Sequence, residues 1–292
     1  MKLITFEAER EARLGVLVDK LVVDLAEASA GNLPADMRRF LELGQAGLET
    51  ARSVVERALT KGQTVAVDAV KLLAPILNPQ KIIAIGQNYM DHCREQQVEP
   101  PKSPIIFAKF PTSIIGPAAE IRWDPALTRQ VDFEAELAVV IGRLARRVSQ
   151  AEALDYVAGY TICHDVSARD LQFCDRQWVR GKSLDTFCPL GPYLVTKDEI
   201  ADPQKLAIRC RLNDEVMQNS NTSEMIFDVC YLIEYISRAF TLLPGDVITT
   251  GTPDGVGVFR SPQVFLKDGD RVTIEIEGLG QLSNLCVEEP QI

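Results

Sequence analysis

The first 25 residues alternate apolar and polar positions in the runs LITF and GVLVDKLVVDL. Successive side chains of a strand point to opposite faces, so this alternation is typical of strands that bury one face. The polar pair Asp19 and Lys20 interrupts the second run. We therefore predict a small antiparallel sheet with a turn near these two residues.

Apolar residues then recur at helical spacing over residues 34–61. This pattern predicts helices that each carry one apolar stripe, with a break around Gly44 and Gly47 and an end at Gly62. The run VKLLAPILNPQ follows, and its two prolines are typical of a connector.

We place a domain boundary in this connector, with a small N-terminal α+β domain over residues 1–77 and a second domain over residues 78–292. Short β-like runs separated by turn residues dominate the second domain: KIIAIG, SPIIFAKF, SIIGP, EIRW, DFEAELAVVIGR, AGYTICHDV, GPYLVT, KLAIRCRL, DVITTG and RVTIEIEG. Helices are predicted over 151–157, opened by a capping box that starts at Ser149, and over 229–240. The fold class is therefore α+β, mainly β, with a β roll or sandwich as the catalytic unit.

Composition narrows the range of partners. Hydrophobic residues make up 46% and charged residues 25% of the 292 residues, as in ordinary globular proteins. The 31 Lys and Arg against 41 Asp and Glu give a net charge of −10, which disfavours nucleic acids and anionic membranes as partners. No apolar run approaches the ~20 residues that span a bilayer, and no export signal is visible. Seven scattered cysteines without a Cys-x-x-Cys pair are typical of a reducing compartment, so we expect a cytoplasmic protein without structural zinc.

Two glutamates stand out in the predicted strand VDFEAELAVVIG, residues 131–142. Strand alternation places Glu134 and Glu136 on one face, which turns apolar at Ala138, while Phe133 begins the opposite, fully apolar face. Two carboxylates about 7 Å apart can converge on one hard cation such as Mg²⁺ or Ca²⁺. The alternative is a strand face that is exposed to solvent.

A third carboxylate closes the next predicted strand. Asp165 ends the run AGYTICHDV, before a turn or short helix that carries Ser167, Arg169 and Asp170. Asp165 can supply a third oxygen ligand and leave coordination positions for water and substrate. The alternative for Asp165 is a helix N-cap.

Two further segments carry candidate polar contacts. Gly181, Lys182 and Ser183 superficially resemble a phosphate loop, but a Walker A motif needs a glycine where Arg176 stands, so nucleotide binding is excluded. Lys182 is then a partner of the carboxylates or of an anionic substrate, or else a surface lysine. The run GDVITTGTPDGVG, which contains Thr252, lets backbone N–H groups approach a carboxylate closely, although a tight turn explains its glycines equally well.

A possible acid–base pair follows the strand KIIAI. In the predicted helix of IGQNYMDHCREQQ, His92 and Glu95 are three residues apart and share one side. A histidine oriented by a carboxylate is the usual arrangement for activating water. The alternative is a surface His–Glu pair.

In combination, six ordered motifs resemble the fumarylacetoacetate hydrolase family, in particular its domain-containing and homoprotocatechuate-pathway isomerase branch: NYMDHCRE, PIIFAKF, DFEAELAVVIG, GYTICHDVSARDLQ, QWVRGKSLDTFCPLGP and PGDVITTGTPDGVG. The resemblance covers residues 80–287. It implies the family's mixed β-sandwich roll behind a small N-terminal domain, and a homodimer.

The resemblance also implies roles for ten residues. Three would be ligands of Mg²⁺ or Mn²⁺: Glu134, Glu136 and Asp165. Three would be catalytic, namely the acid–base dyad and the lysine beside the metal: His92, Glu95 and Lys182. Four would contact substrate: Lys109, Arg169, Gln172 and Thr252. Two positions depart from the family pattern near the presumed pocket, Gln87 and Leu171, and these bear on substrate identity.

The implied activity is metal-dependent chemistry on a small anionic 2-oxo or 2,4-dioxo acid through an enolate. C–C bond hydrolysis of an acylpyruvate such as fumarylpyruvate is our first expectation. The alternatives at the same site are oxaloacetate tautomerisation or decarboxylation and isomerisation of 2-hydroxyhepta-2,4-diene-1,7-dioate. A catalytically silent metal-binding homologue is the remaining alternative, although a structural cation site needs neither the dyad nor Lys182.

Overall fold

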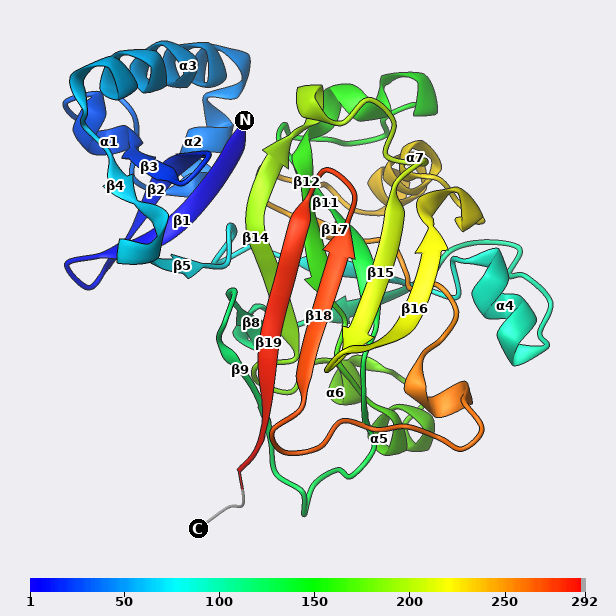
Figure 1. Cartoon of the computed structure of the whole chain (residues 1–292). Coiled ribbons are helices and arrows are strands. Elements are labelled where there is room, and N and C mark those ends of the chain that lie inside the picture. Colours follow the sequence, from blue (N-terminus) through cyan, green and yellow to red (C-terminus); the bar gives the residue numbers. More distant parts are fainter. Residues whose placement is uncertain (290–292) are drawn as a thin grey trace.

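The computed structural model describes residues 1–289, and its architecture is dominated by one large mixed sheet (Figure 1). This sheet has twelve strands, and ten of them follow one another in the order β4 (Val65–Ala66), β3 (Leu21–Asp24), β2 (Glu11–Val18), β1 (Lys2–Ala8), β14 (Cys188–Thr196), β12 (Val157–His164), β11 (Ala135–Ile141), β17 (Val247–Thr249), β6 (Ile82–Gly86) and β7 (Ile105–Lys109). Two short strands attach beside this path, β5 (Lys71–Leu73) on β1 and β8 (Ile114–Ile115) on β14.

A second sheet covers one face of the large one. Its five strands run in the order β16 (Glu215–Asn221), β15 (Ala207–Leu212), β18 (Arg271–Ile276), β19 (Gly280–Glu288) and β9 (Glu120–Trp123). A two-stranded ribbon joins β10 (Val131–Asp132) to β13 (Ser167–Ala168). The predicted α+β, mainly β class with a β-sandwich roll is confirmed.

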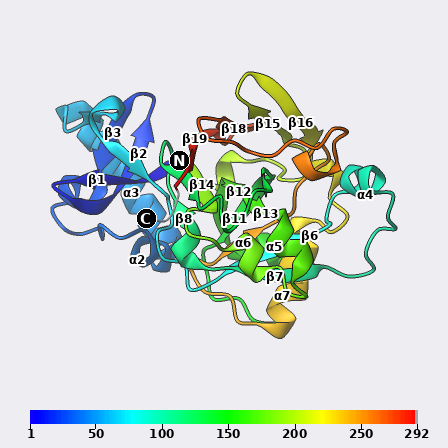
Figure 2. The ribbon, with the colours of Figure 1, turned by 90° about the horizontal axis from the view of Figure 1, so that it is seen from below.

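Helices and short 3₁₀ turns connect these strands. The α-helices are α1 (Leu25–Ala28), α2 (Met37–Glu42), α3 (Gly44–Lys61), α4 (Met90–Gln96), α5 (Arg169–Cys174), α6 (Val179–Lys182) and α7 (Val229–Ala239). Short 3₁₀ turns are η1 (Val67–Ala69), η2 (Pro111–Ser113), η3 (Gln150–Tyr156), η4 (Lys197–Glu199), η5 (Thr222–Glu224) and η6 (Gly257–Phe259). Figures 1 and 2 both place α4 at the edge of the molecule, away from the N-terminal strands.

Two details of the predicted helices are wrong, the break at Gly47 and the capping box at Ser149. Gly47 does not break the chain, because it lies inside α3, and only Gly44 marks the junction with α2. The helix predicted over 151–157 is present as the 3₁₀ helix η3, but the predicted capping box is wrong, because Ser149 makes no side-chain cap to the backbone. The Ser149 hydroxyl donates instead to the Glu152 carboxylate at 2.6 Å. The predicted end at Gly62 and the helix over 229–240 are confirmed.

The N-terminal strands join the large sheet directly. The predicted turn at Asp19 and Lys20 connects β2 to β3, and β1 pairs with β14 through Lys2 and Leu3. One hydrophobic cluster contains residues from both sides of position 77. The boundary at that position stays a prediction.

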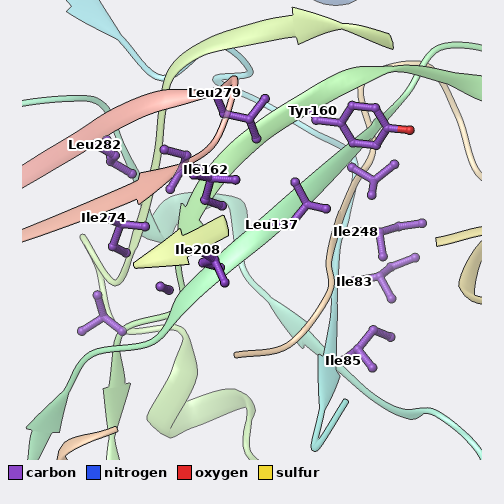
Figure 3. Close-up of a cluster of buried hydrophobic side chains, with 14 of the residues drawn as sticks. Ile83, Ile85, Leu137, Tyr160, Ile162, Ile208, Ile248, Ile274, Leu279 and Leu282 are labelled. Carbon is purple, nitrogen blue, oxygen red and sulfur yellow. The ribbon is translucent and has the colours of Figure 1, made fainter. Parts of the chain in front are cut away.

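Strand β11 separates the two hydrophobic clusters, as the alternation of its sequence predicted. Ala135, Leu137 and Val139 face the main core between the two sheets, where Figure 3 shows Leu137 among Ile162, Ile208 and Ile274. Ala138 and Val140 face the other cluster, toward the N-terminal strands. The carboxylates that precede Ala138 are thus held on a rigid central strand.

Within residues 1–289, no helix is long and apolar enough to cross a membrane.

Leu137→Ala should lower the free energy of unfolding by about 2–5 kcal/mol, because the side chain is fully buried between the two sheets and its loss leaves a cavity. The matched control is Leu144→Ala, at a position that is 59% exposed, where we expect a change within about 0.5 kcal/mol. Urea unfolding followed by circular dichroism measures both, and equal losses would contradict this packing.

Candidate active site

Three carboxylates converge at one end of the central strands. Glu134 lies between β10 and β11, Glu136 on β11, and Asp165 directly after β12, where its N–H donates to the Glu134 carbonyl at 3.0 Å. One carboxylate oxygen from each lies within 4.8 Å of the other two, and all three side chains are buried. The two alternatives raised by the sequence are therefore wrong. This strand face is not exposed to solvent, and the N-cap of α5 is Ala168 rather than Asp165.

Buried cations surround this cluster. The Lys182 ammonium lies 2.8 Å from a Glu134 oxygen and 2.8 Å from Asp165 Oδ2. Arg169 Nη1 lies 2.7 Å from Glu134 Oε1, and the Lys109 ammonium lies 2.6 Å from Asp165 Oδ1. Lys182 is thus a partner of the carboxylates, as predicted, and it is not a surface lysine.

The carboxylates differ in how well their charge is balanced. Burial alone would raise the pKa of Glu134, but the charges of Lys182 and Arg169 outweigh it and lower this pKa to about 2. Burial and the neighbouring charges of Asp165 and Glu134 raise the pKa of Glu136 well above its usual range. Among the described residues, the Glu136 carboxylate accepts one hydrogen bond, from the Gly251 N–H at 2.9 Å. Glu136 therefore retains the most spare capacity to bind a cation.

This donor set fits a hard divalent cation. Mg²⁺, Mn²⁺ and Ca²⁺ prefer oxygen ligands, and the cluster offers three carboxylates close enough to share one ion. The like charges of Glu134, Glu136 and Asp165 also make a cation at their centre favourable. Which metal binds stays a prediction.

The glycine-rich run after β17, residues 250–257, donates hydrogen bonds from its backbone N–H groups to several acidic side chains. The Gly251 N–H donates to Glu136, and the Gly255 N–H donates to Glu95 Oε1 at 3.0 Å. Gly255 has a φ of +95°, and a Cβ there would lie 2.2 Å from the Met217 carbonyl oxygen, so glycine is required. The carboxylates that this run approaches belong to the protein itself.

The acid–base pair is formed in the structure. His92 Nδ1 lies 3.0 Å from Glu95 Oε2 on α4, and Gly255 holds the second oxygen of the same carboxylate. His92 is 6% exposed, so the alternative of a surface pair is wrong. The bond to Glu95 orients the imidazole and leaves Nε2 as the nitrogen available for proton transfer.

A cavity of about 90 Å³ brings six of the ten predicted site residues together. These six are His92, Glu134, Arg169, Gln172, Lys182 and Thr252. Glu136, Asp165 and Glu95 stand behind them as their neighbours. Lys109 is not part of the lining, since its ammonium is bonded to Asp165 and to the carbonyl oxygens of Val166 and Lys182.

Aromatic walls were not predicted. The cavity is also lined by Phe107, Phe173, Trp178 and Phe259. The rings of Phe107 and Trp178 pack edge to face at 5.3 Å, and the Lys182 ammonium lies 5.3 Å from the Phe107 ring centre. A sequence signal existed for Phe107, which stands two positions before Lys109 and shares its strand face.

The two residues that depart from the family pattern, Gln87 and Leu171, lie in different places in the structure. Gln87 lines the cavity, as expected, and its amide donates to Gln96 Oε1 at 3.3 Å. Leu171 packs against the main core instead, and Phe173 of the same helix lines the cavity. The predicted influence of Leu171 as a pocket residue is therefore wrong.

Comparison with known proteins agrees with this geometry. The model of the fumarylacetoacetate (FAA) hydrolase C-terminal family matches residues 81–287. The chain belongs to the fumarylacetoacetate hydrolase family. Oxaloacetate tautomerase fahd2, mitochondrial, from Xenopus laevis is 53% identical over 268 residues, which cover 91% of this chain and 82% of that protein. Human oxaloacetate tautomerase FAHD2A, mitochondrial, is 51% identical and covers 87% of this chain and 81% of its own length.

Solved structures of the fumarylacetoacetate hydrolase family superimpose over the whole chain. Fumarylacetoacetate hydrolase from Exiguobacterium antarcticum has a TM-score of 0.86 at 38% identity, covering 99% of this chain and 100% of its own. Maleylpyruvate hydrolase from Sphingobium sp. SYK-6, solved with manganese(II) and pyruvate, has a TM-score of 0.81 at 30% identity and covers both chains completely. The 2-hydroxyhepta-2,4-diene-1,7-dioate isomerase from Mycobacterium marinum has a TM-score of 0.78 at 37% identity, again over both complete chains.

The predicted family and the prediction of an enzyme are confirmed by these relatives. The cytoplasmic location is not confirmed, because the two tautomerases are named as mitochondrial proteins.

Glu136→Gln should reduce Mn²⁺ affinity by at least about 100-fold, since it removes a carboxylate that points into the cluster. The same change should leave the metal-free protein at least as stable as the wild type, because Glu136 has no ion-pair partner among the described residues. Calorimetric titration with Mn²⁺ and thermal unfolding in EDTA measure the two effects. Unchanged Mn²⁺ affinity would contradict the proposed ligand.

Asp165→Ala should differ from Glu136→Gln in the stability of the metal-free protein. It should also remove Mn²⁺ binding, but it leaves two buried ammonium groups, those of Lys109 and Lys182, without a shared acceptor. Breaking such buried pairs costs about 3–5 kcal/mol, so metal-free Asp165→Ala should unfold at a lower temperature than Glu136→Gln. Glu99→Gln, at an exposed position outside the cluster, is the control for both.

Proposed function

We propose that this protein is a divalent-metal-dependent tautomerase that interconverts the keto and enol forms of oxaloacetate. The sequence put acylpyruvate hydrolysis first and oxaloacetate tautomerisation second. The relatives reverse this order, because proteins that are 51–53% identical over most of the chain are named oxaloacetate tautomerases.

The observation that carries the proposal is the small size of the cavity. A volume of about 90 Å³, walled by four aromatic rings, suits a four-carbon diacid better than the seven-carbon substrates of the alternatives. Arg169 and Lys182 supply positive charge on the wall, and Gln172 and Thr252 supply hydrogen-bonding groups. Oxaloacetate is a short dianion with one carbonyl group, which this lining complements.

Arg169 is the best-placed group for a substrate carboxylate. Its Nε and Nη1 are bonded to protein acceptors, whereas its buried Nη2 has no partner among the described residues. A buried guanidinium nitrogen without an acceptor is costly, and a substrate carboxylate would satisfy it.

Two neighbouring side chains, Thr252 and Gln172, also keep hydrogen-bond donors free for a substrate. Gln218 donates to the Thr252 hydroxyl at 2.8 Å, which leaves the Thr252 proton free to donate into the cavity. The Gln172 carbonyl oxygen accepts from Arg169, which leaves the Gln172 amide hydrogens free. Lys109 has a different role in this proposal: it holds Asp165 in place and does not contact substrate.

His92 moves the proton in the proposed reaction. With Nδ1–H donated to Glu95, His92 Nε2 accepts a proton from C3 of the keto acid, and the imidazolium then gives this proton to the C2 oxygen to form the enol. The reverse reaction retraces both transfers. The Lys182 ammonium stabilises the negative charge that develops on the C2 oxygen. A divalent cation held by Glu134, Glu136 and Asp165 would supply additional electrostatic stabilisation of that enolate charge.

C–C hydrolysis is the second candidate. Maleylpyruvate hydrolase shares the fold at a TM-score of 0.81, and its structure contains manganese(II) and pyruvate. The same His92–Glu95 dyad can activate water if a substrate presents a carbonyl at C4. Oxaloacetate decarboxylation and diacid isomerisation require the same enolate.

We further propose Mg²⁺ or Mn²⁺ as the metal and a homodimer as the assembly.

A substrate panel tests the proposal. The purified protein with Mg²⁺ is assayed against oxaloacetate, fumarylpyruvate, acetylpyruvate and 2-hydroxyhepta-2,4-diene-1,7-dioate by the change in enol absorbance. We expect faster approach to the keto–enol equilibrium of oxaloacetate and slower turnover of the three others. Faster hydrolysis of fumarylpyruvate would favour the second candidate, and turnover of no substrate would favour a silent metal-binding protein.

His92→Gln should lower kcat for oxaloacetate by about 10²–10⁴-fold, because it removes the proton-transferring nitrogen. Mn²⁺ affinity should be unchanged, since His92 is not one of the clustered carboxylates. Arg94→Ala is the control on the same helix, where the side chain is exposed and pairs with Glu224. Wild-type kcat in His92→Gln would contradict the assigned role.

A further inference from the structure

Asp132 is a buried carboxylate that the chemistry above does not use. It ends β10, two positions before Glu134, and its side chain is fully buried. Its oxygens accept from Arg169 Nε at 2.8 Å and from the backbone N–H groups of Gly257 at 2.8 Å and Val258 at 3.0 Å. A fourth bond comes from the Phe133 N–H at 2.8 Å. A carboxylate with four donors is held in a single orientation.

The Asp132 carboxylate fixes the orientation of the Arg169 guanidinium group. The guanidinium lies between two acids, with Nε on Asp132 and Nη1 on Glu134 Oε1. This fork leaves Nη2 without a partner in the described part of the chain, although Arg169 lines the cavity. If Asp132 were neutral, Glu134 would be the remaining charged partner, and the guanidinium would be drawn toward the carboxylate cluster.

We propose that Asp132 is a positioning residue that orients Arg169 so that Nη2 meets the substrate carboxylate. This inference rests on the proposed function for the identity of the substrate. Asp132 itself touches neither substrate nor reacting atoms; it acts through Arg169 and keeps that cation from competing for Glu134.

The glycine-rich run fixes Asp132 from the other side. A Cβ on Gly257 would lie 2.6 Å from Asp132 Oδ1 and 1.8 Å from the Val264 carbonyl oxygen, so the approach of this backbone to Asp132 requires a glycine. The same run holds Glu136 through Gly251 and Glu95 through Gly255. One segment thereby aligns the metal cluster, the dyad and the arginine with one another.

Asp132→Asn tests the inference, because it keeps the shape of the side chain and removes its charge. We expect the KM for oxaloacetate to rise at least about tenfold with a smaller change in kcat, since a charge-assisted bond that orients the binding group is lost. The affinity for pyruvate in the presence of Mn²⁺, measured by calorimetry, should fall by a similar factor. Asp170→Asn is the matched control: Asp170 bonds to Thr128 and Arg129, so its loss should lower the melting temperature and leave KM unchanged.

A double-mutant cycle separates positioning from a general structural role. If Asp132 acts through Arg169, adding Asp132→Asn to Arg169→Ala should change pyruvate affinity by less than about twofold, so the two effects are not additive. Independent, additive losses would overturn the inference, as would a wild-type KM in Asp132→Asn.

Asp132→Glu decides the matter if Asp132→Asn does not fold. It keeps the charge beside Arg169 but displaces the carboxylate by one methylene, so a positioning role predicts a raised KM and a weaker pyruvate complex. Wild-type values in Asp132→Glu would overturn the inference.

Failure of the wild type to equilibrate oxaloacetate would refute the proposed function alone, because pyruvate affinity still reports on Asp132. A wild type that binds no pyruvate with Mn²⁺ would overturn the inference about Arg169.

Discussion

Burial of like charges is the constraint on which this structure depends. Three buried carboxylates, those of Glu134, Glu136 and Asp165, converge so that one oxygen of each lies within 4.8 Å of the other two. Buried ions cost several kcal/mol each unless they are paired and hydrogen-bonded. The compensating cations come from separate elements, Lys109 at the end of β7, Arg169 at the start of α5 and Lys182 at the end of α6. The fold must therefore be complete before the cluster can form.

The central sheet provides the rigidity that this cluster needs. On β11 the face that carries Glu136 continues into Ala138 and Val140, which pack against the N-terminal strands, while the opposite face forms the main core. A displacement of β11 would expose apolar surface on both faces. The backbone that presents the carboxylates is thus fixed by packing, and the Glu136 side chain is held by a hydrogen bond from a different segment, the glycine-rich run after β17.

Alternation in the sequence predicted which residues share a face, but not which atoms meet. It grouped Glu134 with Glu136, and it would also have grouped Asp132 with them, because all three stand two positions apart. Asp132 was overlooked because only its bonds to Gly257 and Val258, 125 and 126 positions away, reveal a role. Lys109 was identified, yet the sequence could not show that its ammonium is bonded to Asp165. The break at Gly47 was predicted wrongly because a single glycine lowers local helix stability by only about 1 kcal/mol, which tertiary packing overrides.

Counting Asp132 changes the electrostatics of the site. Its charge offsets Arg169, so the four buried carboxylates, when all of them are ionised, exceed the three buried cations by one negative charge. A bound divalent cation would reverse the sign to one positive charge, and the site would then attract a dicarboxylate within a protein whose overall charge is −10. Substrate affinity and metal affinity are therefore coupled through charge. The carboxylates and their cations set the charge of the site, whereas the cavity walls, here four aromatic side chains with Gln87 and Gln96, limit the size of the ligand that fits.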